Sequence, residues 1–242
     1  MGASMKRIWL CTSLALFLPL HSAANSSSLS AIYRLREEAY LLRGALIAKV
    51  SPDQTTNRAL GDGAVFGAQF EIGSISKAFT GITLAQLAVD QKVDLDLPIA
   101  NYIPEFQGTF IGTVSANELA THRARLINSY VESSGKTSER YTPQELIQFL
   151  KVYRPDPTQF PAGTRSYSNL SFAALGLLIQ RIEKTESFVE VVKSKVLDPL
   201  GMTRTGFISS NSKPKNLVQG FDVLLRAASY YPISDLACAS GG

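Results

Sequence analysis

The pattern of apolar and polar positions predicts strands near the start of the chain and helices through its middle. An apolar run at residues 45–50 ends at the turn signal 51–53, and a return strand is expected near 58–60. After a glycine-rich stretch, a helix is expected over residues 74–91, apolar on nearly every side and therefore central and buried. This order favours an α/β sheet domain with a helical insertion.

Helical spacing of apolar residues predicts further helices at 29–42, 115–120, 142–153, 169–184 and 188–197. Thr142 and Pro143 are a capping residue and a first-turn proline, and they fix the start of the third of these. The fourth begins at Asn169 or Ser171. Residues 93–104 read as a proline-punctuated loop and residues 131–140 as a polar connection.

The first 24 residues have the features of a secretory signal peptide. Lys6 and Arg7 precede an apolar run at 8–20, and small residues follow at 22–24. The run is too short to span a bilayer. The alternatives to a signal peptide are an uncleaved anchor and a buried strand. We expect cleavage, export to the periplasm of a bacterium or secretion, and no stable membrane span in the mature chain.

Composition indicates a globular protein, with 45% hydrophobic and 18% charged residues. The formal charge of +4 falls by two once Lys6 and Arg7 leave, because residues 1–24 carry no acidic side chain. The basic residues are scattered, so no nucleic-acid partner is expected.

Histidine and cysteine are too scarce for metal or disulfide chemistry. Two of each occur, and His21 and Cys11 lie in the leader. We therefore expect no zinc site, no metal and no cofactor. Cys238 is expected to be a small buried residue. No G-x-S-x-G motif accompanies His122, which reads as a packing or loop residue and not as a general base.

Ser74 and Lys77 form an S-x-x-K pair at the start of the expected buried helix. Side chains three residues apart on a helix share one face. A serine hydroxyl needs a neighbouring base, and a desolvated lysine can act as one. The same pattern occurs at Ser133/Lys136 and Ser210/Lys213. Only Ser74 has a glycine before it and an apolar helix after it, while Ser76 should point elsewhere.

Tyr167-Ser168-Asn169 is the only Y-x-N in a chain with nine tyrosines. A phenol beside a cation can relay protons, and an amide side chain offers a donor and an acceptor to an amide-bearing substrate. Alternatively, Tyr167 packs at a helix entry and Asn169 caps that helix. Pairing with Ser74 and Lys77 favours the catalytic interpretation.

Three stretches together resemble the serine β-lactamase-related family, of the class C β-lactamase, D,D-peptidase and family esterase type. They read F-E-I-G-S-I-S-K-A-F-T-G, P-A-G-T-R-S-Y-S-N-L-S-F-A-A-L-G and L-D-P-L-G-M-T-R-T-G-F, within about residues 45–207. The resemblance implies Ser74 as acylated nucleophile, Lys77 as its proton partner, Tyr167 as base or relay, and Asn169 as substrate contact. It implies a small-molecule or peptidoglycan-peptide substrate: a β-lactam, a D-Ala-D-Ala peptide or an ester. It also implies an α/β (α+β) fold like that of β-lactamases and penicillin-binding proteins, with an antiparallel sheet flanked by helices plus a helical domain, and the site between them.

The sequence departs from the family pattern in two places. The T-H-T-S-G-L-like stretch reads Ala-Thr-His-Arg-Ala-Arg-Leu at 120–126, and the K-T-G or H-x-G motif of the family's edge strand is absent. That strand normally donates to the oxyanion hole, and losing one such donor costs roughly 10²–10³-fold in rate. We therefore expect residues 25–242 to be an incomplete domain, its C-terminal part missing, with a sheet part near 29–70 and a helical part about 74–200. A non-catalytic remnant or binder is the alternative.

Overall fold

The computed structural model describes residues 44–61, 67–131, 137–138, 140–208, 214–220, 227 and 233–241. The chain divides into two compact units. One comprises Met1–Glu71 with Pro214–Tyr231, and the other Ile72–Lys213 with Pro232–Gly242. The expected leader at 1–24 and the expected helix at 29–42 lie outside the described residues.

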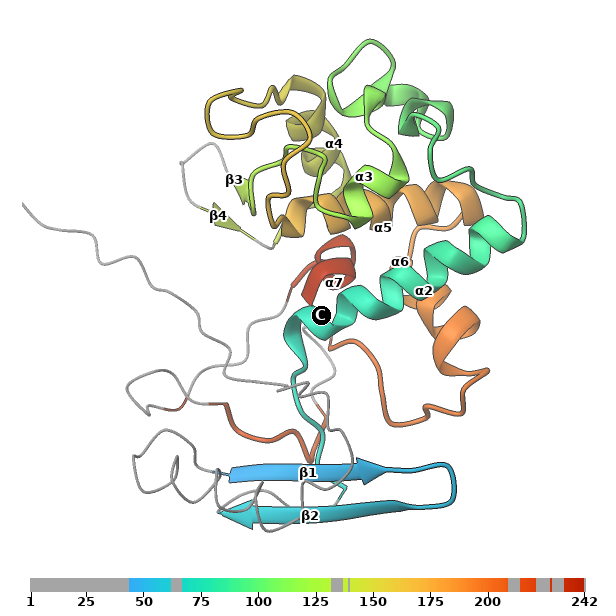
Figure 1. Cartoon of the computed structure of the whole chain (residues 1–242), viewed down its shortest axis with the longest axis vertical. Helices are drawn as coiled ribbons and strands as arrows, with labels where there is room; N and C mark the ends of the chain where they lie inside the picture. Colours follow the sequence, from blue (N-terminus) through green and yellow to red (C-terminus); the bar gives the residue numbers. More distant parts are fainter. Residues whose placement is uncertain are drawn as a thin grey trace, which may run out of the picture. The chain divides into compact units, whose positions relative to one another are not determined.

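The first unit contains an antiparallel hairpin (Figure 1). Strand β1 (Gly44–Val50) pairs with β2 (Thr55–Gly61) in a register that sets Gly44 opposite Gly61 and Val50 opposite Thr55. The turn is closed by Ser51, whose N–H donates to the carbonyl of Gln54 at 2.9 Å. Both predicted strands are confirmed, and the second starts three residues earlier than expected because the pairing continues to the turn.

Helices predominate in the described part of the second unit, which also contains a two-residue pairing of β3 (Tyr130–Val131) with β4 (Thr137–Ser138) (Figure 1). That pairing begins one residue before the expected polar connection at 131–140 and otherwise lies within it. The expected loop at 93–104 also contains two 3₁₀ turns, Ile99–Asn101 and Pro104–Phe106. The helices are α2 (Ser76–Val89), α3 (Ala116–Ala120), α4 (Pro143–Val152), α5 (Asn169–Glu183), α6 (Phe188–Val192) and α7 (Asp235–Gly241).

Side-chain caps mark the starts of α3, α4 and α5, whereas α2 has none. Ser115 and Glu118 form a capping box at α3, and Thr142 and Glu145 form another at α4. At α5, Ser168 accepts a hydrogen bond from the Ser171 N–H, so this helix begins at Asn169. The predicted helices over 115–120, 142–153 and 169–184 are therefore confirmed.

The expected helix at 188–197 changes pitch halfway. After α6 the chain is π-helical over Lys193–Leu197, and the N–H of Asp198 donates to the carbonyl of Lys193 at 2.9 Å. An ion pair of 2.7 Å joins the side chains of the same two residues. Apolar spacing alone did not predict this widened turn.

Helix α5, not α2, is the most deeply buried element of the second unit. Every residue of α5 from Leu170 to Gln180 is buried. The expectation that the helix following Ser74 is buried on nearly every side is wrong, because Ile82 and Val89 on α2 are 43% and 81% exposed. Thr80 and Thr83 lie on its buried face instead, their hydroxyls bonded to backbone carbonyls.

Helix α7 packs closely on α5. A Cβ added at Gly176 of α5 would lie 3.0 Å from the Cβ of Ala239 on α7. Asp235 anchors the start of α7, since its carboxylate accepts from the Phe188 N–H at 2.7 Å and from Gln180 Nε2 at 3.0 Å. These contacts join α7 to α5 and α6, and they fix where its last turn lies.

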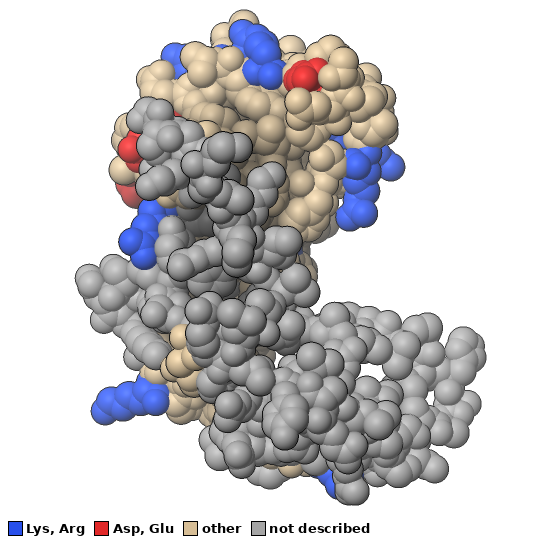
Figure 2. Space-filling model, turned by 90° about the vertical axis from the view of Figure 1, so that its left-hand side faces the viewer, with Lys and Arg blue, Asp and Glu red and all other residues tan. Residues whose placement is uncertain are grey.

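On the face shown in Figure 2, the Lys and Arg side chains of the described residues stand apart from one another and form no single patch. Among the described residues, no helix combines the length and apolar character needed to cross a membrane.

Candidate active site

Ser74 lies in the 3₁₀ turn Gly73–Ile75 that leads directly into α2. Gly73 has a φ of +51°, a conformation that glycine adopts without steric cost. The Ser74 side chain is exposed, whereas Ser76 is buried and its Oγ donates to the carbonyl of Gly73 at 2.8 Å. Of these two nearby serines, only Ser74 is exposed to solvent.

Lys77 lies one turn further along and contacts three oxygens. Its Nζ donates to Ser74 Oγ at 3.2 Å, to Asn169 Oδ1 at 2.7 Å and to the backbone carbonyl of Ser240 at 2.5 Å. The amine is therefore held by α2, α5 and α7 together. Its position next to the serine does not depend on the lysine rotamer alone.

The phenol of Tyr167 also contacts Ser74. Tyr167 Oη and Ser74 Oγ are 2.6 Å apart, and Lys77 Nζ lies 4.8 Å from the centre of the tyrosine ring. The ring is 46% exposed. The next residue is fixed, because Ser168 is fully buried and its Oγ donates to the carbonyl of Ile127 at 2.7 Å.

The structure thus brings all four residues expected at the site into one cluster connected through Ser74 and Lys77. Ser74 and Lys77 come from one stretch, and Tyr167 and Asn169 come from another some ninety residues away. Ser133/Lys136 and Ser210/Lys213 lie outside the described residues.

Two contributors to the site were missed at the sequence level. One is the Ser240 carbonyl, which side-chain identity cannot reveal because it is a backbone group. The other is His122, whose ring centre lies 4.6 Å from that of Tyr167. The sequence predicts that His122 is a packing or loop residue, and its ring does pack, against the ring of Tyr167. Its place in the stretch that resembles the T-H-T-S-G-L segment of the family was the available signal.

The pKa of His122 is held below its ordinary value, mainly by burial and further by the positive charges of Lys77 and Arg165. The imidazole is therefore neutral at pH 7. Burial also raises the pKa of the Cys238 thiol to about 12. Cys238 is 3% exposed, as expected of a small buried residue, and it does not act as a nucleophile.

Arg125 occupies the position where the family pattern has a turn glycine, and its φ is +59°. This conformation is uncommon for residues with a side chain. Contacts of the side chain offset the strain. Its Nε donates to the carbonyl of Phe160 at 2.8 Å, and its guanidinium lies 5.8 Å from the ring centre of Phe110.

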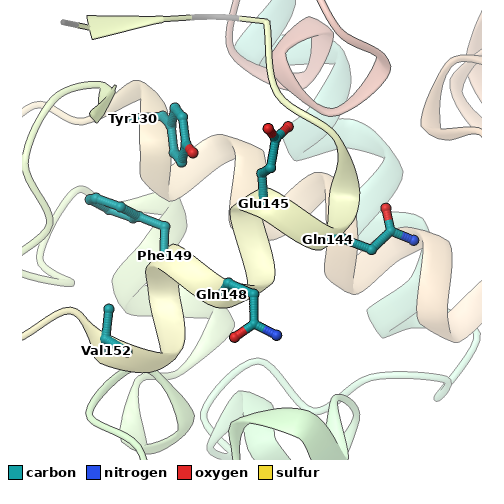
Figure 3. Close-up of a pocket in the computed structure, with 6 residues that line it drawn as sticks. All are labelled: Tyr130, Gln144, Glu145, Gln148, Phe149 and Val152. Atoms are coloured by element: carbon teal, nitrogen blue, oxygen red, sulfur yellow. The ribbon is translucent and has the colours of Figure 1, made fainter. Parts of the chain in front are cut away.

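A separate hollow of about 480 Å³ lies along α4 (Figure 3). None of the four candidate site residues lines it. Tyr130 and Phe149 meet edge to face at 5.2 Å, and Glu145 is occupied with capping Thr142. Half-buried aromatic rings and the exposed side chains of Gln144 and Gln148 therefore form its surface. It is lined by Tyr130, Gln144, Glu145, Gln148, Phe149 and Val152.

In the part of the chain that the structure describes, no group of three His, Cys, Asp or Glu side chains could hold a metal.

The β-lactamase family model matches residues 38–232. The chain belongs to the β-lactamase family. It is 26% identical over 159 residues to Protein flp of Staphylococcus aureus strain COL, covering 64% of this chain and 31% of that protein. It is 29% identical over 153 residues to a β-lactamase of Providencia stuartii, covering 63% of this chain and 38% of the relative.

Solved structures share the fold. The β-lactamase/D-alanine carboxypeptidase of Pseudomonas syringae matches with a TM-score of 0.73 and 22% identity, over 88% of this chain and 59% of the other. Chains described as class C β-lactamases match as well. The expected fold class is confirmed. The chain spans about a third of the length of the curated relatives.

Proposed function

We propose that this protein is a bacterial serine hydrolase, exported to the periplasm or secreted, that forms an acyl-enzyme on Ser74. The observation that carries the proposal is the position of Ser74 Oγ, 2.6 Å from Tyr167 Oη and 3.2 Å from Lys77 Nζ. A serine hydroxyl becomes an effective nucleophile when a neighbouring group takes its proton. Both groups that could do so are in hydrogen-bond contact with it.

In the proposed reaction, Ser74 Oγ attacks the carbonyl carbon of the substrate and the carbon–nitrogen bond of the amide breaks. Tyr167 Oη accepts the Oγ proton while its own hydroxyl proton passes to the departing nitrogen, with Lys77 as proton partner. Water releases the acyl group in a second step. Asn169 uses its Oδ1 to hold Lys77 at 2.7 Å, which leaves its amide nitrogen to donate to the substrate. Ser74 also lies at the start of a helix, where partial positive charge stabilises developing negative charge.

The names of similar proteins support β-lactams or D-alanyl peptides of peptidoglycan as the substrate class. Small acyl esters would use the same residues. A turnover assay therefore needs one substrate of each kind. A non-catalytic binder that kept this constellation would hydrolyse none of them.

The test is the turnover of nitrocefin, a D-Ala-D-Ala peptide and p-nitrophenyl acetate by the unchanged chain and by Ser74→Ala. We expect turnover of at least one substrate, falling by about 10³-fold or more in Ser74→Ala because the nucleophile is gone. Ser76→Ala is the matched control. It should keep most of the activity, since the Ser76 hydroxyl is buried against Gly73.

Turnover that survives Ser74→Ala, or that is lost equally in Ser76→Ala, would overturn the assignment of the nucleophile. The same rate with all three substrates in the presence and absence of the protein would favour the non-catalytic alternative.

A further inference from the structure

His122 contacts the chain on both sides of Tyr167. Its backbone carbonyl accepts a hydrogen bond from the Ser166 N–H at 2.8 Å, and its Nδ1 accepts one from the Ser168 N–H at 3.2 Å. Its ring lies against the Tyr167 ring, with the centres 4.6 Å apart and the planes inclined by 38°. Three contacts from one residue thus surround the tyrosine of the site.

His122 itself is held rigidly. It is 5% exposed, and its ring also contacts Phe172 of α5, with the centres 5.2 Å apart. Its N–H donates to the carbonyl of Leu119 at the end of α3. Its φ of +61° is uncommon for a non-glycine residue and lets the carbonyl and the imidazole both face the Tyr167 segment. A strained conformation of this kind persists only where the surroundings over-determine it.

We propose that His122 is a positioning residue for Tyr167: its neutral imidazole and its carbonyl hold residues 166–168 so that the phenol oxygen stays at Ser74 Oγ. The inference rests on the proposed function for its catalytic consequence, but the positioning itself concerns the Tyr167 segment whether or not the chain is active. It assigns His122 no proton transfer to the substrate.

The hydrogen bond from the Ser168 N–H requires an unprotonated Nδ1, because a protonated Nδ1 would place a second donor against that N–H. The charged and titratable groups that face His122 are Lys77 from α2 and Arg165 and Tyr167 from the segment before α5, while α5 presents the uncharged Phe172. A protonated ring would therefore add a third positive charge beside two others. Because the pKa of His122 is lowered, Nδ1 remains an acceptor at pH 7. The acceptor is lost as the pH falls through the pKa of His122, which lies below the ordinary histidine value of about 6.5.

Two substitutions separate the hydrogen bond from the ring. His122→Asn keeps an acceptor near the position of Nδ1, tolerates a positive φ and cannot be protonated. His122→Phe keeps a ring against Tyr167 but leaves the Ser168 N–H without its acceptor. We expect acylation by a fluorescent penicillin to fall about 10–100-fold in His122→Phe, since small displacements of a reacting group cost this much. In His122→Asn it should fall by about 3-fold at most.

The pH dependence of the acylation rate distinguishes this positioning role from a purely structural one. Acylation by the unchanged protein should decline at a pH below the ordinary pKa of histidine, because the pKa of His122 is lowered by burial and by the charges of Lys77 and Arg165. His122→Asn should lack this part of the decline because nothing at position 122 titrates. The same decline of acylation at acidic pH in the unchanged protein and in His122→Asn would contradict the proposal. So would equal acylation by His122→Phe and the unchanged protein.

Amide hydrogen exchange tests the same proposal without any turnover. The Ser168 amide should be protected in the unchanged protein and in His122→Asn, and its protection factor should fall at least about 10-fold in His122→Phe while amides of α5 keep theirs. Retained Ser168 protection in His122→Phe would overturn the positioning role. Absence of Ser74-dependent acylation together with the expected exchange pattern would instead count against the proposed function alone.

Discussion

Lys77→Ala is expected to lower the acylation rate of Ser74 by about 10³-fold, within the range that a positioned proton-transfer group contributes. The amine is the only described group that contacts Ser74, Asn169 and the Ser240 carbonyl at once. Its removal takes away the cation beside Ser74 Oγ and leaves the Asn169 and Ser240 oxygens without this donor. The measurement is the second-order rate constant for labelling by a fluorescent penicillin, with circular dichroism and melting as checks on folding.

Lys92→Ala provides the matched control. Lys92 follows the C-terminus of α2 and forms an ion pair with Glu183 at 2.9 Å, an exposed interaction of the kind that contributes little to stability. Its removal should leave labelling within about 2-fold of the unchanged protein. Labelling by folded Lys77→Ala at more than a tenth of the original rate would show that another group takes the serine proton.

Gly176→Leu is expected to destabilise the second unit by about 3 kcal/mol or more, the upper range of costs for forcing atoms into a packed core. A Cβ at this position already lies 3.0 Å from the Ala239 Cβ and 3.4 Å from Leu236 Cδ2, so a larger side chain must push α7 away from α5. Displacement of α7 would also draw the Ser240 carbonyl away from Lys77 and the Ala239 carbonyl away from Thr80. Denaturant unfolding and the labelling rate should therefore both change.

Gly81 on α2 offers the same substitution in an open place, because nothing lies within 4 Å of a Cβ built there. Gly81→Leu should retain the original stability or gain up to about 1 kcal/mol from the higher helix propensity of leucine. If the two variants unfold at the same denaturant concentration, the close packing of α7 on α5 is not what fixes the last turn of α7.

Helix starts were predictable from sequence because local side chains determine them. Thr142 and Glu145 satisfy each other's backbone donors within four residues, so the start of α4 needs no information from the rest of the fold. Burial was less predictable. Apolar content suggested a buried α2, but whether Ile82 meets another element depends on tertiary packing, and polar Thr80 is buried because Ala239 supplies an acceptor.

At the candidate site, too, local features were predictable from the sequence and tertiary contacts were less so. Ser74 and Lys77 are three residues apart, and Tyr167 and Asn169 are two apart, so each pair was visible in the sequence. Their meeting in one cluster was predicted from the family resemblance, and the structure places them in contact, while their catalytic roles stay predictions. The third partner of Lys77 is a backbone carbonyl, and His122 contacts Tyr167 through folding alone. The backbone carbonyl leaves no pattern in the sequence, and the signal for His122 was its place in the T-H-T-S-G-L-like stretch and not its spacing from Tyr167.

The central claim, that Ser74 is the acylated nucleophile, is tested most directly by mapping the covalent adduct. The protein is incubated with a fluorescent penicillin, digested with trypsin and analysed by fragmentation mass spectrometry. Cleavage after Arg58 and Lys77 releases one peptide that contains both Ser74 and Ser76, so the fragment ions must separate the two serines. We expect the acyl group on Ser74, with no adduct in Ser74→Ala. An adduct on Ser76, or on any residue in Ser74→Ala at the original yield, would contradict the account.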